Sequence, residues 1–224
     1  MLTLQAKGCH NINLVTPTHY IPQILMSLEM ALERGLDIPI VYNTSGYELA
    51  ETIKLLDGIV DIYLPDIRYS DNEAAKKYSD ADRYVEFNRA ALKEMRRQVG
   101  DLEIDEAGIS KKGLIIRLLA LPNSISGTED TLRFIRKELG RNSYLSIMSQ
   151  YYPTFKACGL NEISRGITPE EYKNVVDEAY LLELNNGWLQ ERPANADPGF
   201  MGTNIKQTPL EGFLPSNGVK RRIE

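Results

Sequence analysis

The sequence predicts an α/β fold built on a parallel sheet, and three observations support this. Short runs rich in β-branched residues alternate with segments of helical periodicity, which is typical of βαβ units. Polar residues stand where each apolar run ends. The chain has 224 residues, 42% hydrophobic and 25% charged, which suits one large globular domain. We expect one domain over residues 1–190 and an irregular extension over 191–224, where periodicity vanishes.

Five apolar runs are expected to form the strands. In chain order they cover residues 11–15, 38–42, 60–64, 114–119 and 144–148. Since helical segments separate them, we expect them to lie parallel and side by side.

Helices are expected between and after these strands. The first is marked by Ile24, Leu25, Leu28 and Leu32 at helical spacing and by Gly35 at its end. The last begins at a capping threonine followed by Pro169 and two glutamates. A polar loop over 100–113 separates the fourth strand from the helices before it. The expected helices cover residues 21–34, 47–56, 72–78, 83–98, 129–139 and 169–184.

Charge and hydropathy exclude several classes of protein. The net charge of −5 argues against a general nucleic-acid binder, and the basic run 220–222 is short enough to be a solvated tail. No stretch approaches the roughly 20 apolar residues of a membrane span. The first residues lack the apolar run of a secretory signal, so we expect a cytoplasmic protein without nucleic-acid or membrane partners.

The two cysteines are too few for a disulfide framework. Cys9 stands beside an apolar strand and is expected to be a free, buried thiol. Cys158 falls in a loop and is expected to be more exposed.

Five polar clusters follow the expected strands. Because ligands bind at the carboxyl ends of parallel strands, these clusters are expected to converge on one rim that holds a polar ligand. For a single cluster, polar loop chemistry is an equally good explanation. The clusters are residues 16–19, 43–46, 65–68, 122–123 and 149–152.

Asp66 and Arg117 are the most informative polar residues of the chain. Arg117 interrupts an apolar strand, where an unpaired charge is costly, so it needs Asp66 or a ligand carboxylate as partner. Asp66 ends a strand and is placed to accept from a hydroxyl or ammonium group, or alternatively to cap the next helix. We expect Arg117 to be at least half-buried and paired with Asp66.

The remaining candidates have two interpretations each. His19 either orients a ligand or acts in proton transfer, or it caps the following helix. Asn43 and Ser45 suit an anionic group at a helix N-terminus or serve as turn residues. Gln150 is expected to line the mouth of the site. No catalytic-triad, nucleotide-loop or metal-ligand pattern occurs, so catalytic residues stay unknown and no metal ligand is assigned.

The chain resembles the radical S-adenosylmethionine (SAM) superfamily, in the branch related to pyruvate formate-lyase activating enzyme. The resemblance covers residues 2–184 and is carried by segments 8–19, 40–47, 60–66, 94–100 and 113–117. It implies a partial (β/α)6 TIM-like barrel with its first strand missing, a [4Fe–4S] cluster and SAM. It further implies that the cluster cleaves SAM and that a hydrogen atom is abstracted from a substrate, with activation of a glycyl radical enzyme as one option.

The resemblance also implies site residues and partners. The turn containing Thr16, Thr18 and His19 stands where the family often has a glycine-rich turn that meets the SAM amino group. Asn43, Ser45, Asp66 and Arg117 fall at strand ends that typically contact SAM or substrate, and we add Gln150 to this SAM-binding set. The implied partners are SAM, a protein substrate, and an electron donor such as flavodoxin or ferredoxin.

The chain departs from the family pattern in three places. The C-x3-C-x2-C cluster motif would lie upstream of Met1, and neither Cys9 nor Cys158 has cysteine neighbours to replace it. Leu118 follows Arg117 where the branch usually has histidine, and Asn123 stands where it tends to have glycine. Two rival hypotheses therefore stay open: a cluster-free binding module with a small-molecule pocket, and an unrelated α/β enzyme acting through Asp66 and Arg117.

Overall fold

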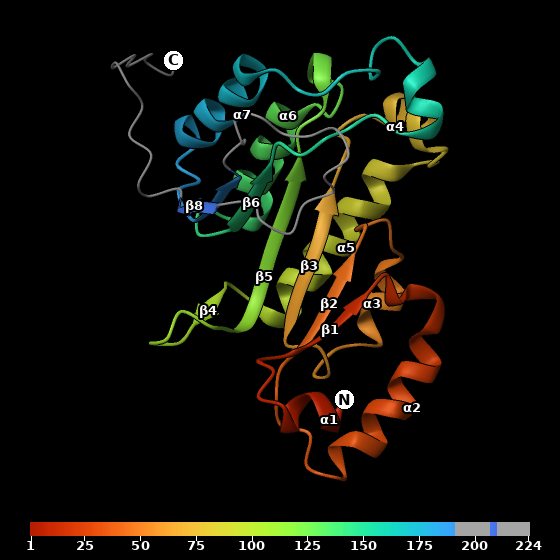
Figure 1. Ribbon diagram of the computed structural model, residues 1–224, viewed down its shortest axis with the longest axis vertical. Helices are drawn as coiled ribbons and strands as arrows, with labels where there is room; N and C mark the ends of the chain where they lie inside the picture. Colours follow the sequence, from red (N-terminus) through yellow and green to blue (C-terminus); the bar gives the residue numbers. More distant parts are fainter. Residues whose placement is uncertain (191–206, 210–224) are drawn as a thin grey trace.

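A computed structural model describes residues 1–190 and 207–209 of the chain (Figure 1). Six strands form a parallel sheet in the order β1-β2-β3-β5-β6-β7. They are β1 (Ile12–Val15), β2 (Ile40–Thr44), β3 (Ile62–Ile67), β5 (Ser110–Leu119), β6 (Tyr144–Met148) and β7 (Gly187–Gln190). The predicted α/β class and the five parallel, adjacent strands are confirmed. Within the described residues the sheet does not close, so the fold is a partial, TIM-like barrel.

Two short strands run antiparallel at the margins. The strand β4 (Glu103–Ile104) pairs with β5, so part of the expected polar loop is a hairpin. Asp105 makes that turn because its carboxylate accepts from the backbone N–H groups of Ala107 and Ile109. The strand β8 (Gln207–Pro209) pairs with β7. Apart from β8, the extension predicted over 191–224 lies outside the described residues and stays a prediction.

The helices follow the predicted order. They are α1 (Leu2–Ala6), α2 (Ile21–Leu32), α3 (Ala50–Lys54), α4 (Asn72–Ser79), α5 (Tyr84–Val99), α6 (Thr128–Phe134) and α7 (Pro169–Leu181), with the 3-10 turns η1 (Pro17–Tyr20), η2 (Pro122–Ser124) and η4 (Phe155–Gly159). The predicted helix 47–56 is shorter, since its first residues form the loop after β2. The predicted helix 129–139 ends in a π turn, η3 (Ile135–Leu139), where the Gly140 N–H bonds to the Ile135 carbonyl. Strand β7 and helix α1 were not predicted.

The helices cover one face of the sheet, which we call the outer face; Figure 1 shows α5 behind β3 and β5. Outward-pointing strand residues such as Tyr63, Ile116 and Ile147 are fully buried and belong to one hydrophobic core with residues of α2, α3, α5, α6 and α7. Burial of this size is the main stabilising contribution to the fold.

The opposite, inner face carries a smaller cluster of Val41, Ile62 and Ile115, with Leu64 and Trp188 packed against it. No described helix contributes to this cluster. None of the helices in the described ranges is both long and apolar enough to cross a bilayer.

One edge of the sheet is formed by β1, whose Val15 is 67% exposed. The resemblance implies a barrel with its first strand missing, and within the described residues no strand pairs with the outer edge of β1. Cys9, just before β1, is a free thiol but only half-buried, because it stands in the connection after α1 rather than inside the core. Cys158 is exposed, as expected.

Candidate functional site

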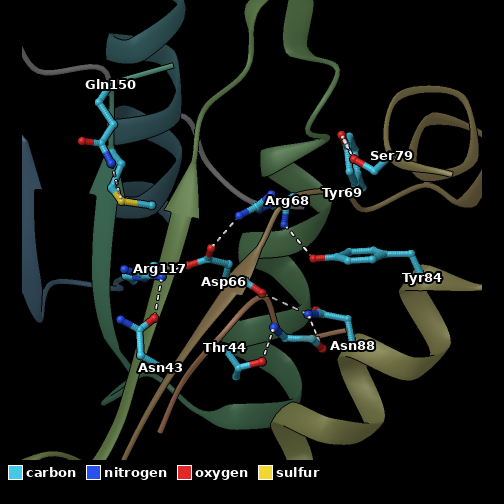
Figure 2. A network of polar contacts seen from close by, with 12 residues as sticks. Asn43, Thr44, Asp66, Arg68, Tyr69, Ser79, Tyr84, Asn88, Arg117 and Gln150 are labelled. Atoms are coloured by element: carbon cyan, nitrogen blue, oxygen red, sulfur yellow. Dashed lines mark hydrogen bonds and ion pairs between the residues drawn. The ribbon is translucent and has the colours of Figure 1, made fainter. Parts of the chain in front are cut away.

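Asp66 and Arg117 form the centre of a polar network at the carboxyl ends of β2, β3 and β5 (Figure 2). The two residues are direct neighbours in the register of β3 and β5. Arg117 Nε donates to Asp66 Oδ1 over 2.6 Å, and its Nη2 donates to Asn43 Oδ1 over 2.9 Å. The Asp66 side chain is 9% exposed and that of Arg117 27% exposed. The predicted burial and pairing of Arg117 are therefore confirmed.

A second arginine, which sequence reasoning missed, also pairs with Asp66. Arg68 Nη2 donates to Asp66 Oδ2 over 3.1 Å, and its side chain is 47% exposed. The period-two spacing of Asp66 and Arg68 at a strand end was the available signal. Two guanidinium groups around one carboxylate leave one net positive charge. Guanidinium groups present several N–H donors in a planar fork, so this arrangement suits a carboxylate or another anion.

The aspartate is held in place from the helix side by Asn88 of α5. The Asn88 side chain is 1% exposed, and its Nδ2 donates to the carbonyls of both Gly46 and Asp66, at 3.0 and 3.1 Å. Gly46 has a φ of 73°, and a Cβ there would lie 2.3 Å from the Asp66 carbonyl oxygen. The loops after β2 and β3 can approach each other only because this residue is glycine. Asn88 therefore fixes the distance between the Asn43 and Asp66 strand ends.

The backbone following Asp66 is fixed by Tyr84. The Arg68 N–H donates to the Tyr84 hydroxyl over 2.9 Å. Burial raises the pKa of Tyr84 above its ordinary value, so this phenol stays neutral at physiological pH.

The turn after β1 divides the predicted residues between two environments. Thr16 has a left-handed φ of 51° and is exposed, and its N–H donates to the Asn43 carbonyl. His19 is exposed in η1. Thr18 turns away from Arg117, because its hydroxyl donates to Glu48 over 2.6 Å. The structure therefore places Thr16 beside Asn43 and does not join Thr18 or His19 to the network.

Glu48 was also missed. It is 3% exposed, and one of its oxygens accepts from the hydroxyls of Thr18, Tyr42 and Thr44. Its other oxygen has no hydrogen-bond partner among the described residues. These contacts lie on the outer side of β2, since Tyr42 belongs to the helix-covered core. Glu48 therefore belongs to the support of the β2 loop.

Gln150 stands at the end of β6 and is exposed. Its Oε1 accepts from Gln190 Nε2 over 3.1 Å, and its Nε2 contacts the Met148 sulfur. Among the described residues Gln150 forms no hydrogen bond with Asp66 or Arg117, although it lies at the same end of the sheet (Figure 2). Ser45 is half-buried in the loop after β2.

The cysteines do not fit an iron–sulfur cluster. Such a cluster takes three or four converging thiolates, and the chain has two cysteines. Cys9 lies before β1, at the amino end of the sheet, whereas Cys158 lies in η4, after the carboxyl end of β6. Among the described residues there is no group of three or more histidine, cysteine or acidic residues that could hold a metal ion.

Comparison with solved structures shows a related fold. The chain is similar to a domain of pyruvate-formate lyase-activating enzyme from Bacteroides vulgatus ATCC 8482, with a TM-score of 0.54 over 81% of this chain and 98% of that domain. Sequence identity is 9%, so the likeness concerns the fold alone. It agrees with the partial barrel that the resemblance implies.

Comparison of sequences finds a relative without an assigned activity. An uncharacterized protein of Methanocaldococcus jannaschii is 32% identical over 179 residues, which is 78% of this chain and 48% of that protein. The chain thus spans about half the length of the relative it matches. No protein-family model matches the sequence.

Proposed function

We propose that this chain binds S-adenosylmethionine at the carboxyl edge of its sheet, as part of a radical SAM enzyme related to pyruvate formate-lyase activating enzyme. The observation that carries the proposal is the buried Asp66 between Arg117 and Arg68, whose net positive charge suits a ligand carboxylate. The similarity of the fold to a domain of an activating enzyme supports the assignment.

In this proposal each side chain of the network has one task. Arg68 and Arg117 donate to the methionine carboxylate of SAM. Both side chains are paired with Asp66 and both remain partly exposed, so a ligand can reach them. Asp66 and Asn43 orient the Arg117 guanidinium through the hydrogen bonds that they accept from it. Thr16, exposed in the turn after β1 with its N–H bonded to the Asn43 carbonyl, offers its hydroxyl to the SAM amino group. Thr18, His19, Ser45 and Gln150 stay candidates for the rest of the ligand.

The two cysteines of this chain do not fit a [4Fe–4S] cluster. We therefore propose the radical chemistry only for a protein that contains this chain together with the cysteines that bind the cluster. Such a protein would cleave SAM and abstract a hydrogen atom from a substrate, with a glycyl radical enzyme as one substrate class and flavodoxin or ferredoxin as electron donor.

The separation of the two cysteines also favours a second candidate function. A cluster-free module would bind SAM or a similar polar molecule at the same rim and carry out no radical cleavage. Iron and sulfide content after anaerobic reconstitution distinguishes the two. We expect the 224-residue chain alone to show no stable [4Fe–4S] spectrum and to form no 5′-deoxyadenosine. A version extended with a C-x3-C-x2-C segment of the same coding sequence should gain both, and reconstitution without that gain supports the cluster-free module.

SAM binding itself is tested by equilibrium dialysis of the 224-residue protein. We expect saturable binding in the wild type and a loss of at least about tenfold in affinity in Arg117→Met, because a charge-assisted pair contributes about 1.5–3 kcal/mol. Arg97→Met is the matched control, since Arg97 is an exposed arginine of α5 that pairs with Asp57 and Glu94. Equal affinity in both variants, or no saturable binding in the wild type, contradicts the proposal.

A further inference from the structure

Strand β7 adds an aromatic residue to the row that contains the proposed anion site. Asp66 is in register with Arg117, Arg117 with Ser146, and Ser146 with Trp188. Residues in register on neighbouring parallel strands point to the same face of a sheet. Trp188 packs against the inner-face cluster, which agrees with this placement. The row therefore begins with charged groups and ends with an indole ring.

The position of β7 is tightly fixed. Gly187 approaches β6 so closely that a Cβ would lie 1.9 Å from the Leu145 carbonyl oxygen. The Tyr172 hydroxyl of α7 joins the two strands, because it donates to the Ile147 carbonyl and accepts from the Gln190 N–H. The Gln190 side chain accepts from the Ser149 N–H. Trp188, between these anchors, is held in a preorganised position.

The surroundings of Trp188 leave it partly exposed. Its ring contacts Tyr144 at a centroid distance of 4.8 Å with an interplanar angle of 59°. It is partly buried rather than enclosed. Trp188 is the single tryptophan among the 224 residues. Its fluorescence therefore reports on this one position.

The spacing of the row defines the ligand that it fits. Two strand spacings separate Arg117 from Trp188, which is about 10 Å. A matching ligand has an anionic group at one end and a planar ring at the other. A nucleoside with a carboxylate-bearing tail has this arrangement, and SAM is one such molecule.

We infer that Trp188 is a specificity-determining residue that stacks on the nucleobase of a purine nucleoside ligand whose anionic end pairs with Arg117. The inference rests on the proposed function, to which it adds the subsite on β7. Stacking of a base on an aromatic side chain changes affinity by roughly 5- to 150-fold.

The first test is a fluorescence titration of the wild-type protein with adenosine, SAM and methionine. We expect adenosine and SAM to quench the emission of Trp188 saturably and methionine to leave it unchanged. The second test measures adenosine affinity by dialysis in variants that circular dichroism shows to be folded. Trp188→Leu should weaken binding about 5- to 150-fold, whereas Trp188→Phe should retain most of it. Phe155→Leu, which changes a ring that is 86% exposed in η4, is the matched control and should bind like the wild type.

The outcomes separate this inference from the proposed function. SAM binding with unchanged emission and unchanged affinity in Trp188→Leu overturns the stacking role and leaves SAM binding intact. If adenosine quenches saturably, but SAM binds no more tightly than adenosine and equally well in Arg117→Met, the subsite is supported. The same result counts against the proposed function. If neither ligand binds, the inference is overturned.

Discussion

Replacing Arg117 by methionine tests whether the pair with Asp66 is a structural necessity as well as a ligand contact. The substitution keeps an unbranched apolar stem and removes both the charge and the hydrogen bonds to Asp66 and Asn43. The Asp66 carboxylate, 9% exposed, then has Arg68 as its remaining cationic partner. Because Arg68 is about half-exposed, it compensates only in part.

The magnitude follows from the difference in burial between the two arginines. Removing one partner of a buried pair typically costs about 3–5 kcal/mol, because an uncompensated charge is left behind. The remaining Arg68 and the partial exposure of Arg117 lower this, so we expect Arg117→Met to reduce the free energy of unfolding by about 2–3 kcal/mol. Arg68→Met removes a pair that is much more exposed and should cost at most about 1 kcal/mol.

Urea denaturation of the two arginine variants measures these values. Asp66→Asn and the double variant Asp66→Asn/Arg117→Met complete a double-mutant cycle. The cycle should give a coupling free energy between Asp66 and Arg117 of about 1–3 kcal/mol. Equal destabilisation by the two arginine substitutions, or no coupling between Asp66 and Arg117, would refute the reasoning from burial.

Three further predictions concern the support of the site and the last helix. Gly46→Ala should lower the free energy of unfolding by about 2–4 kcal/mol, because the new Cβ meets backbone and side-chain atoms. Gly58→Ala, at a similar φ of 76° but in open space, should lower it by about 1 kcal/mol. Equal losses for the two variants in urea denaturation would count against the close approach at Gly46. Asn88→Ala removes two buried hydrogen bonds and should cost about 2–3 kcal/mol; a loss below about 0.5 kcal/mol in the same assay would show that the clamp contributes little. The Arg165 guanidinium holds the pKa of Glu171 well below its ordinary value of 4.5, so the stabilisation by this carboxylate is present above that pH and is lost as the pH falls through and below it. The stability difference between wild type and Glu171→Gln should thus be constant near neutral pH and shrink in acid, and a difference that grows in acid has the wrong sign.

The strands and the pairing of Arg117 could be predicted because each depends on local rules. Apolar runs with polar ends gave five strands in the correct order, and the cost of an unpaired charge in a strand led to the correct partner, Asp66. The π turn after α6 and the exact bounds of the predicted helix α3 could not be predicted, because tertiary packing around the loops decides where such helices begin and end.

The missed residues depend on contacts between distant segments. Asn88 bonds to the carbonyls of Asp66 and Gly46, which lie 22 and 42 residues away in the sequence. The periodicity of its helix does not predict these contacts. Strand β7 is four residues long, too short for an apolar run to stand out in the sequence, so Trp188 was not recognised as part of the sheet. Arg68 follows Asp66 by two residues, but an arginine at this position is equally well explained as a solvated loop charge. Its pairing with Asp66 was therefore not predicted. Thr18 points toward Glu48, which an inspection of strand ends alone does not reveal.

A crystal structure of the protein with SAM tests the central claim most directly. We predict SAM on the inner face at the carboxyl ends of β3 and β5, with its carboxylate within hydrogen-bonding distance of the Arg117 or Arg68 guanidinium. SAM bound at another surface, or an Asp66–Arg117 network that remains unchanged and distant from the bound ligand, would contradict the account.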